Sequence, residues 1–398
     1  MPAQTTDLGV AVSEVDASGV LEMRAAVLRE PGRPVSTETV LLAPPRRGEV
    51  LVRVAAAGVC RSDLHLADGV LGAGRWPIVL GHEGAGAVEA VGEDVGAVAV
   101  GDHVAFCLVP ACGMCGPCRA GRPTLCEPAG RNGVAGMLMD GTSRLRARDG
   151  TELQHGFMVA CFAEYVVVPA AGAVPLPPSI PLWQAALLGC GVVTGIGAVN
   201  RAGVRVGDTV AVVGCGGVGL QVIAGARLAG AATIVAIDRD PDKLERALRR
   251  GATHVVDADR SGAVAVADDV VALTGGGVDH AFEVIGTPAT IRQAWDMLRP
   301  GGSAMVVGVA PAGAEVALPA IEFLSEKTIT GSYYGSSDVA RAMRGIAQLV
   351  VDGRLDLDGV VSDLIALDEV EAALERLRRG EGARSVIVID EALAGVAR

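Results

Sequence analysis

Four cysteines lie close together in the first third of the chain, in the stretch PACGMCGPCRAGRPTLCEP. They are Cys112, Cys115, Cys118 and Cys126. Two C-x-x-C steps share a middle residue, and the fourth thiol follows eight residues after the third. This spacing is typical of four thiolates around one Zn²⁺, and Gly113 and Gly116 allow tight turns between them. Because four protein ligands leave no open position, the sequence predicts a structural zinc site.

A pair of disulfides or a redox-active dithiol is the alternative interpretation of this cluster. The chain has 9 Cys, an odd number, and its N-terminus MPAQTTDLGVAVSEVDASG lacks the basic and apolar regions of a signal peptide. We therefore expect a reducing, cytoplasmic environment, in which clustered cysteines bind metal more often than they form disulfides.

Length and composition exclude several classes of protein. The 398 residues are enough for two domains with full cores. A net charge of −12 argues against a nucleic-acid partner. No apolar run reaches the roughly 18 residues that a membrane-spanning helix needs, so we expect no membrane partner. Glycine occurs 54 times without a period, which is typical of the many turns of a compact α/β protein.

The hydrophobic pattern changes near Thr209. Before it, short valine-rich segments between glycines predict a β-rich region. These segments are Val50–Ala55, Gly86–Val91, His103–Leu108 and Ala163–Val168. After it, apolar strands such as TVAVVG and TIVAID alternate with helices such as Pro241–Arg250, which predicts a doubly wound parallel sheet. The late segment Arg384–Ile389 is a further strand that could return to the first region.

A dinucleotide-binding motif, G-x-G-x-x-G, opens this second region. It reads Gly214, Cys215, Gly216, Gly217, Val218 and Gly219. The motif follows a buried strand and begins a helix, so Gly214 can make the tight turn and Gly219 can bring helix and strand together. Gly216 lets a pyrophosphate approach the backbone amides at the helix N-terminus. The alternative is an ordinary glycine-rich turn, which the flanking strand and helix disfavour.

Asp238 ends the next strand, where it can bind the cofactor's ribose. A carboxylate there accepts hydrogen bonds from the adenosine ribose hydroxyls and repels a 2′-phosphate. The position therefore predicts NAD(H) rather than NADP(H), although the neighbouring Arg239 offsets part of that repulsion.

Three further segments carry residues of types that bind metals. Cys60 lies in GVCRSDLH, His82 and Glu83 lie in GHEGAG, and Cys190 lies in LGCGVVTG. Each residue alone is more typical of an ordinary buried side chain, and their spacing does not unite them. Their types would allow a Cys₂His zinc site with one open position, which is the composition of a catalytic zinc.

Together these motifs resemble the zinc-dependent medium-chain alcohol dehydrogenases, in the long-loop group with two zinc ions. The resemblance runs from Met23 to Ile389 and rests on CRSDLH, GHEGAG, the four cysteines, GCGVVTG, GCGGVG and Asp238. It implies an α/β fold, with a GroES-like β-rich catalytic domain and a Rossmann coenzyme domain. The implied ranges are an N-terminal extension at 1–22, a catalytic domain at 23–190 and 335–398, and a coenzyme domain at 191–334.

The resemblance also implies roles for the dispersed residues. The catalytic-zinc ligands of the family correspond to Cys60, His82 and Cys190, the Cys₂His set known in alcohol dehydrogenases. Ser62 corresponds to the hydroxyl that contacts the alcohol oxygen, and His65 to the far end of a proton relay. Asp63 corresponds to the carboxylate that orients the ligand histidine, and Glu83 to an acid near the metal. Zinc polarises the alcohol or carbonyl, and NAD(H) carries the hydride.

Further cofactor contacts follow from the same resemblance. Arg61 and Arg384 correspond to pyrophosphate-binding residues, Lys243 to a lysine near the adenosine ribose, and Thr194 to a contact on the nicotinamide side. A solvated surface charge is an equal alternative for Lys243.

The substrate pocket is the part that the motifs define least. Leu108 falls where many relatives have an aromatic pocket residue, and a smaller side chain there would admit bulkier or branched alcohols. Trp76, Phe157 and Phe162 are further candidates for the wall, with core packing as the alternative. The insert Arg131–Gly156 resembles the loop that the longer relatives keep over the pocket mouth.

The expected activity is NAD-dependent interconversion of an alcohol and an aldehyde or ketone, with a small-molecule substrate. The alternatives are a dehydrogenase of a formaldehyde–thiol adduct and a nicotinoprotein that keeps NAD(H) bound. A non-catalytic relative is disfavoured because the three ligands, Ser62 and His65 are all present. By resemblance we expect a homodimer or homotetramer, with Gly301–Thr330 pairing between subunits.

Overall fold

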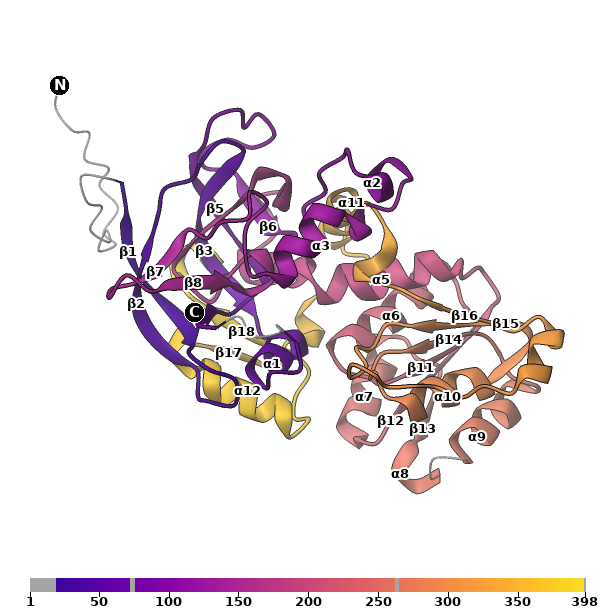
Figure 1. Cartoon of the computed structure of the whole chain (residues 1–398). Helices are drawn as coiled ribbons and strands as arrows, with labels where there is room; N and C mark the ends of the chain where they lie inside the picture. Colours follow the sequence, from indigo (N-terminus) through magenta and orange to yellow (C-terminus); the bar gives the residue numbers. More distant parts are fainter. Residues whose placement is uncertain (1–18, 72–75, 262–264, 397–398) are drawn as a thin grey trace.

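The computed structural model describes residues 19–71, 76–261 and 265–396, which form two lobes side by side (Figure 1). Residues 1–18 of the expected N-terminal extension lie outside the described residues, and the first strand, β1, begins at Leu21. Each lobe is built around its own β-sheets. This division confirms the α/β class and the pairing of a β-rich lobe with a parallel-sheet lobe.

The first lobe contains a closed barrel and a seven-stranded sheet. The barrel runs β1 (Leu21–Leu28), β2 (Ser36–Leu42), β7 (Leu145–Ala147), β8 (Glu152–His155) and β4 (Ile78–Val79). The sheet comprises β10 (Ala173–Pro175), β6 (His103–Phe106), β5 (Glu83–Val91), β3 (Glu49–Gly58), β18 (Ser385–Val388) and β17 (Asp363–Ile365), with β9 (Tyr165–Pro169) also paired to β3. β3 is apolar along most of its length because both its faces are covered.

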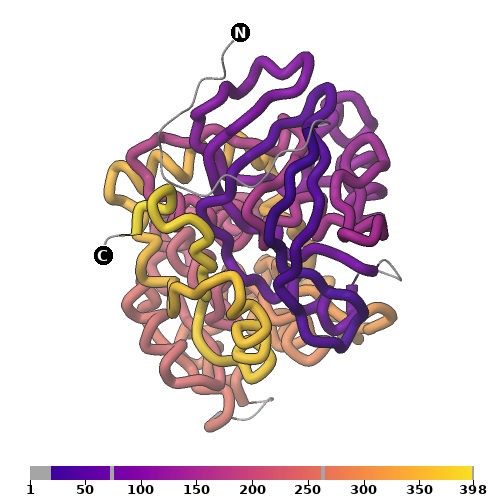
Figure 2. The backbone as a smooth tube through the Cα atoms, turned by 90° about the vertical axis from the view of Figure 1, so that its left-hand side faces the viewer, coloured from indigo at the N-terminus to yellow at the C-terminus, as the bar shows by residue number. Residues whose placement is uncertain are grey.

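Short helices decorate this lobe. They are α1 (Arg61–Ala67), α2 (Gly116–Arg119), α3 (Glu127–Val134), α4 (Leu182–Ala185), α12 (Val370–Arg378) and α13 (Glu391–Ala394), with 3₁₀ turns η1 (Pro123–Leu125), η2 (Gly156–Met158), η3 (Ala170–Gly172), η4 (Ala186–Gly189), η7 (Asp358–Val360) and η8 (Leu367–Glu369). The C-terminal segment returns to the first lobe in both views (Figures 1 and 2). β18 pairs antiparallel with β3, with Ile387 opposite Ala57, which confirms the predicted return of this strand.

The second lobe is one parallel sheet in the order β13-β12-β11-β14-β15-β16. Its strands are β11 (Thr209–Val213), β12 (Thr233–Asp238), β13 (His254–Asp257), β14 (Val278–Glu283), β15 (Leu298–Val306) and β16 (Thr328–Gly331). Its helices are α6 (Gly217–Ala229), α7 (Pro241–Arg250), α8 (Ala258–Ser261), α9 (Ala265–Thr274) and α10 (Pro288–Asp296), with the 3₁₀ helix η5 (Ala320–Ser325). α7 has the bounds that its sequence predicts: Asp240 caps its start, and Gly251 adopts φ 116° at its end.

Two helices join the lobes. α5 (Gly191–Ala202) packs closely on α6, and α11 (Val339–Val351) follows the 3₁₀ turn η6 (Tyr334–Ser336) and packs against α5. A Cβ atom at Gly195 would lie 2.6 Å from Cβ of Gln221, so this glycine sets the close approach of α5 and α6. Among the described residues no single helix could span a membrane; only the bent pair Leu182–Gly189 and Gly191–Ala202 meets the length and composition test, and only jointly.

Candidate active site and zinc centres

The residues of the three dispersed segments meet in the folded chain. One ligand atom from each of Cys60, His82, Glu83 and Cys190 lies within 4.8 Å of the others, and we call this group the mixed cluster. Sheet register explains the meeting: Gly58, near the end of β3, pairs with Glu83 at the start of β5. Cys60 therefore lies close to His82. Cys190 directly precedes α5, and its side chain approaches both.

Asp63 organises one side of the mixed cluster. It is fully buried, and its Oδ1 lies 3.0 Å from Nδ1 of His82 and accepts a hydrogen bond from the Gly81 N–H at 3.1 Å. Its Oδ2 accepts from the Cys60 N–H at 3.0 Å. The carboxylate thus orients the imidazole, and Nε2 of His82 is buried without a hydrogen-bond partner in the described part of the chain.

The mixed cluster has the chemistry of a zinc site. The hydrogen bond with the Cys190 thiol, then the charges of Arg384 and His82, outweigh burial and hold the pKa of Cys60 well below its usual range, which favours a thiolate. Two sulfur atoms and one unpartnered imidazole nitrogen match the ligands that zinc prefers. Burial raises the pKa of Glu83 to about 7, against the opposing charge of Arg384.

Arg384 links the mixed cluster to the nucleotide motif. It is buried, its Nε lies 3.5 Å from Oε1 of Glu83, and its Nη1 donates to the Val59 carbonyl at 3.1 Å. A Cβ atom at Gly217 would lie 2.7 Å from Nη2 of Arg384. The guanidinium therefore contacts the first residue of α6, beside the place where a pyrophosphate would bind.

The glycine motif has the geometry that its sequence predicts. Gly214 adopts φ 101°, and a Cβ at Gly219 would lie only 1.9 Å from the Gly214 carbonyl oxygen. A Cβ at Gly216 would meet no described atom within 4 Å, so the backbone at the α6 N-terminus is open to a ligand. Val218 is the second residue of α6.

Asp238 lies beside this turn at the end of β12. Its Oδ2 accepts from the Cys215 N–H at 2.8 Å, and its Oδ1 accepts from the N–H groups of Arg239 and Asp240 at 2.8 and 3.1 Å. The carboxylate is therefore fixed next to the glycine turn, where it would accept hydrogen bonds from an adenosine ribose.

The other residues expected around the cofactor are less closely gathered. Lys243 forms an ion pair with Asp240, with Nζ 3.8 Å from Oδ2. Arg61 is exposed, and its Nη2 donates to the Leu377 carbonyl at 3.1 Å, so in this structure its guanidinium contacts α12. Thr194 is half-buried in the first turn of α5.

The two expected relay residues lie on α1. Oγ of Ser62 lies 3.9 Å from Sγ of Cys60, which places the hydroxyl at the edge of the mixed cluster. His65 is half-buried one turn later, and its Nδ1 is buried with no hydrogen-bond partner among the described residues. Burial, followed by the charge of Arg61, lowers the pKa of His65.

The four-cysteine cluster forms a separate site. The sulfur atoms of Cys112, Cys115, Cys118 and Cys126 lie within 4.8 Å of one another. Backbone N–H groups of Met114 and Cys115 donate to Sγ of Cys112 at 3.4 and 3.3 Å, and they lower its pKa to about 6. All 9 Cys of the chain lie in described segments and are free, so the disulfide alternative is wrong for this structure.

A cavity of about 190 Å³ adjoins the mixed cluster. Leu108, Trp76 and Phe157 all line it, and the rings of Phe157 and His82 are 4.6 Å apart between centroids. Phe162 instead is fully buried and packs against Gly81, so core packing is the correct interpretation for it. The cavity thus has a largely apolar lining, and Phe157 connects its wall to the imidazole of His82.

Comparisons with known proteins agree with this architecture. The family model of the alcohol dehydrogenase GroES-like domain matches residues 46–178, and that of the zinc-binding dehydrogenases matches residues 217–348. An S-(hydroxymethyl)glutathione dehydrogenase of Escherichia coli is 37% identical over 372 residues, which cover 92% of this chain and 100% of that protein. The chain belongs to the zinc-dependent medium-chain alcohol dehydrogenases. The corresponding Synechocystis enzyme is 38% identical, with the same coverage of both chains.

Solved structures of this dehydrogenase family match over almost the whole chain. An alcohol dehydrogenase zinc-binding domain protein from Burkholderia ambifaria has a TM-score of 0.88 at 36% identity, covering 93% of this chain and 100% of its own. Benzyl alcohol dehydrogenase from Acinetobacter calcoaceticus has a TM-score of 0.87 at 30% identity, covering 93% and 99%. This dehydrogenase is accordingly an oxidoreductase that uses zinc and NAD(H) to interconvert alcohols with aldehydes or ketones.

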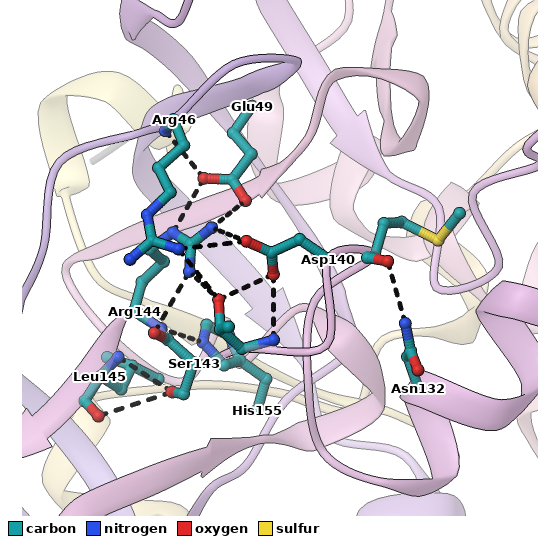
Figure 3. A network of polar contacts seen from close by, with 10 residues as sticks. Arg46, Glu49, Asn132, Asp140, Ser143, Arg144, Leu145 and His155 are labelled. Atoms are coloured by element: carbon teal, nitrogen blue, oxygen red, sulfur yellow. Dashed lines mark hydrogen bonds and ion pairs between the residues drawn. The ribbon is translucent and has the colours of Figure 1, made fainter.

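The insert of this alcohol dehydrogenase is held by a buried charge network (Figure 3). The guanidinium of Arg144 is fully buried and contacts Glu49 through Nε at 2.9 Å and Nη2 at 2.6 Å, and Nη2 also lies 2.7 Å from Oδ2 of Asp140. The Arg144 N–H donates to Nε2 of His155 at 3.1 Å, and His155 lines the cavity. Burial, then the charge of Arg144, lowers the pKa of His155 to about 3, so the ring is neutral.

Several cavity residues were missed by the sequence analysis because they come from unrelated segments. Thr124 lies between two cysteines of the four-cysteine cluster, Tyr333 precedes η6, and His155 ends β8. No periodicity or motif in the dehydrogenase connects these positions. They meet only because η1 packs against η6 and β8 pairs with β4.

Proposed function

We propose that this dehydrogenase oxidises uncharged, largely apolar alcohols with NAD⁺ and reduces the corresponding carbonyl compounds with NADH. The cavity beside the mixed cluster carries this proposal. Among the described residues, its wall contains no Lys, Arg, Asp or Glu side chain. Leucine, isoleucine, valine and aromatic side chains supply most of the lining, so burial of an apolar substrate body would drive binding.

The proposed division of labour follows the positions of the side chains. Cys60, His82 and Cys190 would hold a zinc ion, which would supply Lewis-acid polarisation of the substrate's oxygen. Ser62 would accept the substrate's hydroxyl proton at its Oγ and pass a proton toward His65, which is neutral at physiological pH because its pKa is lowered. Asp63 would keep the imidazole of His82 in the tautomer protonated on Nδ1.

The proposed cofactor site lies between the glycine motif and Asp238. The open α6 N-terminus and the guanidinium of Arg384 support binding of the pyrophosphate there, with Gly214, Gly216 and Gly219 allowing the approach. Asp238 supports a preference for NAD(H). Arg61, Thr194 and Lys243 remain part of the proposal as peripheral contacts.

A formaldehyde–glutathione adduct is the second candidate substrate, because several relatives are named S-(hydroxymethyl)glutathione dehydrogenase. Glutathione carries two carboxylates and an ammonium group, each of which needs an opposite charge when it leaves water. The described cavity wall supplies no such charge. The cavity therefore favours the apolar alcohol over the adduct.

A substrate panel tests this choice. Purified, zinc-loaded protein is given NAD⁺ or NADP⁺ with ethanol, long-chain, allylic, benzylic and secondary alcohols, or with formaldehyde plus glutathione. We expect the highest kcat/KM for an apolar alcohol with NAD⁺, and little rate for the adduct. A strict need for the thiol would overturn the proposal. NADH absorbance that survives dialysis would instead identify a nicotinoprotein.

The proton relay predicts a pH effect of His65→Gln. In the parent enzyme the lowered pKa keeps His65 neutral, and able to accept a proton, to pH values below the ordinary histidine value of 6.5. Without this acceptor, kcat/KM for alcohol oxidation at neutral pH should fall about tenfold or more, and it should recover as rising pH supplies hydroxide. The pH profiles of both proteins measure this. Parallel profiles would exclude His65 from the relay.

The remaining features of the proposal concern the whole molecule. We propose a cytoplasmic protein, since two thiolate sites require reduced cysteines. We also propose a homodimer or homotetramer that pairs through Gly301–Thr330, because β16 is an edge strand and Ile321 and Leu324, on the preceding η5, are exposed. We also propose domain limits at residues 190/191, where α5 begins, and at 334/335, within η6.

A further inference from the structure

Tyr334 lies where the two lobes and the mixed cluster meet. It is buried, with 4% of its surface exposed, and it begins η6 directly after Tyr333, which lines the substrate cavity. No sequence motif singles it out. Its hydroxyl group nevertheless contacts two segments that carry the proposed chemistry.

The hydroxyl of Tyr334 uses both of its hydrogen-bonding functions. It donates to the carbonyl oxygen of Gly189, the residue before Cys190. It accepts from the N–H of Leu108, which lines the cavity, at 3.3 Å. A carbonyl can only accept and a backbone N–H can only donate, so these directions are unambiguous. One oxygen atom therefore connects the backbone at a proposed zinc ligand to the backbone of the pocket wall.

The backbone around Tyr334 is fixed against the helix that starts at the same ligand. Gly335 adopts φ 75°, and a Cβ there would lie 2.4 Å from the Val193 carbonyl oxygen. On the other side, a Cβ at Gly197 would lie 2.5 Å from the Cα of Gly335. Both glycines allow η6 to pack directly on α5. The backbone of Tyr334 is therefore held in place, and its hydroxyl reaches Gly189.

Cys190 depends on this contact because its own backbone lies outside regular structure. Its φ and ψ angles are −145° and −75°, between η4 and α5, and its side chain makes no capping hydrogen bond. The carbonyl of Cys190 accepts from the Thr194 N–H on one side, and the carbonyl of Gly189 lies on the other. The Tyr334 hydroxyl holds that carbonyl.

We propose that Tyr334 is a positioning residue that fixes Cys190 in the mixed cluster and Leu108 in the substrate wall through a single hydroxyl group. The proposal rests on the proposed zinc-dependent function. It assigns Tyr334 no direct contact with substrate or metal. Loss of the hydroxyl leaves a buried carbonyl and a buried N–H without partners, and both segments should then relax.

Tyr334→Phe tests the proposal with three measurements on the zinc-loaded enzyme. We expect kcat/KM for the best alcohol to fall at least about tenfold, with contributions from both KM and kcat. We expect release of one zinc per chain to a chelator to accelerate at least about fivefold, while release of the second, from the four-cysteine cluster, stays unchanged. In a cobalt-substituted enzyme, the thiolate-to-metal charge-transfer band should shift.

Tyr333→Phe is the matched control for metal release, since it removes a neighbouring hydroxyl that, among the described residues, is hydrogen-bonded to neither Gly189 nor Leu108. It should leave both zinc-release rates unchanged, whatever its effect on substrate KM. A Tyr334→Phe enzyme that only melts at a lower temperature, with the parent's kcat/KM, zinc-release rates and cobalt spectrum, would overturn the proposal. If the parent enzyme itself oxidises no alcohol, the proposed function fails instead.

Hydrogen exchange on the parent enzyme keeps the inference testable if the variant does not fold. The Leu108 amide donates to a buried hydroxyl and should exchange slowly, at the rate of the neighbouring β6 amides. Rapid exchange at Leu108 would contradict the contact on which the proposal depends.

Discussion

Cys190→Ala should abolish alcohol oxidation and leave the fold intact. The substitution removes one of the three proposed zinc ligands from the mixed cluster, where its sulfur lies within 4.8 Å of the other ligand atoms. Lewis-acid polarisation contributes several kcal/mol to such reactions, so kcat/KM should fall by at least about a thousandfold. The fold should persist because the Cys190 side chain caps no helix, and its carbonyl still accepts from the Thr194 N–H at 3.0 Å.

Cys161→Ala is the matched control for this variant. Cys161 is likewise a buried, free cysteine, but it belongs to neither cluster of potential ligands. It should lose a little stability and keep most of its turnover and both zinc ions. Steady-state kinetics, metal analysis and thermal melting of the two variants separate chemistry from folding. Full turnover by Cys190→Ala, or unfolding of that variant alone, would contradict the proposed site.

Local signals explain why some elements could be predicted residue by residue. α7 has Asp240 as its cap, Pro241 at its first position and Gly251 at its end, and its bounds match the prediction. The glycine motif likewise combines strand, turn and helix within one short stretch, and its geometry follows from the glycines themselves. The four-cysteine cluster could be predicted for the same reason, because its ligands are close in sequence.

The mixed cluster could not be derived in this way. Cys60 meets His82 only because β3 and β5 pair with Gly58 opposite Glu83, and a strand's register with a distant partner leaves no mark in its own sequence. The resemblance to a family supplied that information. The Tyr334 hydroxyl had no such support: tyrosine is common in cores, and neither the turn at Gly335 nor its contact with α5 has a sequence signature.

Cys115→Ala should produce the opposite result from Cys190→Ala, with loss of stability as the primary effect. Three thiolates cannot close a tetrahedral structural site, so the variant should hold about one zinc per chain instead of about two. The ligand segment has little apolar packing of its own, because Cys112, Cys115 and Cys118 are only partly buried and α2 has no buried residue. We expect its melting temperature to fall by about 5 °C or more.

Met114→Ala provides the control, since Met114 is 75% exposed and contributes only its backbone N–H to Sγ of Cys112. Alanine keeps that N–H, so zinc content and melting temperature should stay at the parent's values. Two zinc ions in Cys115→Ala, or equal melting of both variants, would show that the four cysteines are not a structural metal site.

Loss of the four-cysteine site should also weaken substrate binding. Thr124 lies in η1, between Cys118 and Cys126, and its side chain is part of the cavity wall. η1 packs against η6, the turn that carries Tyr334. When the thiolates no longer hold η1, one wall of the cavity loses its support, so KM for the alcohol should rise more than kcat falls in Cys115→Ala. The closed zinc site would then contribute to substrate binding through the wall that it positions, without taking part in the chemistry.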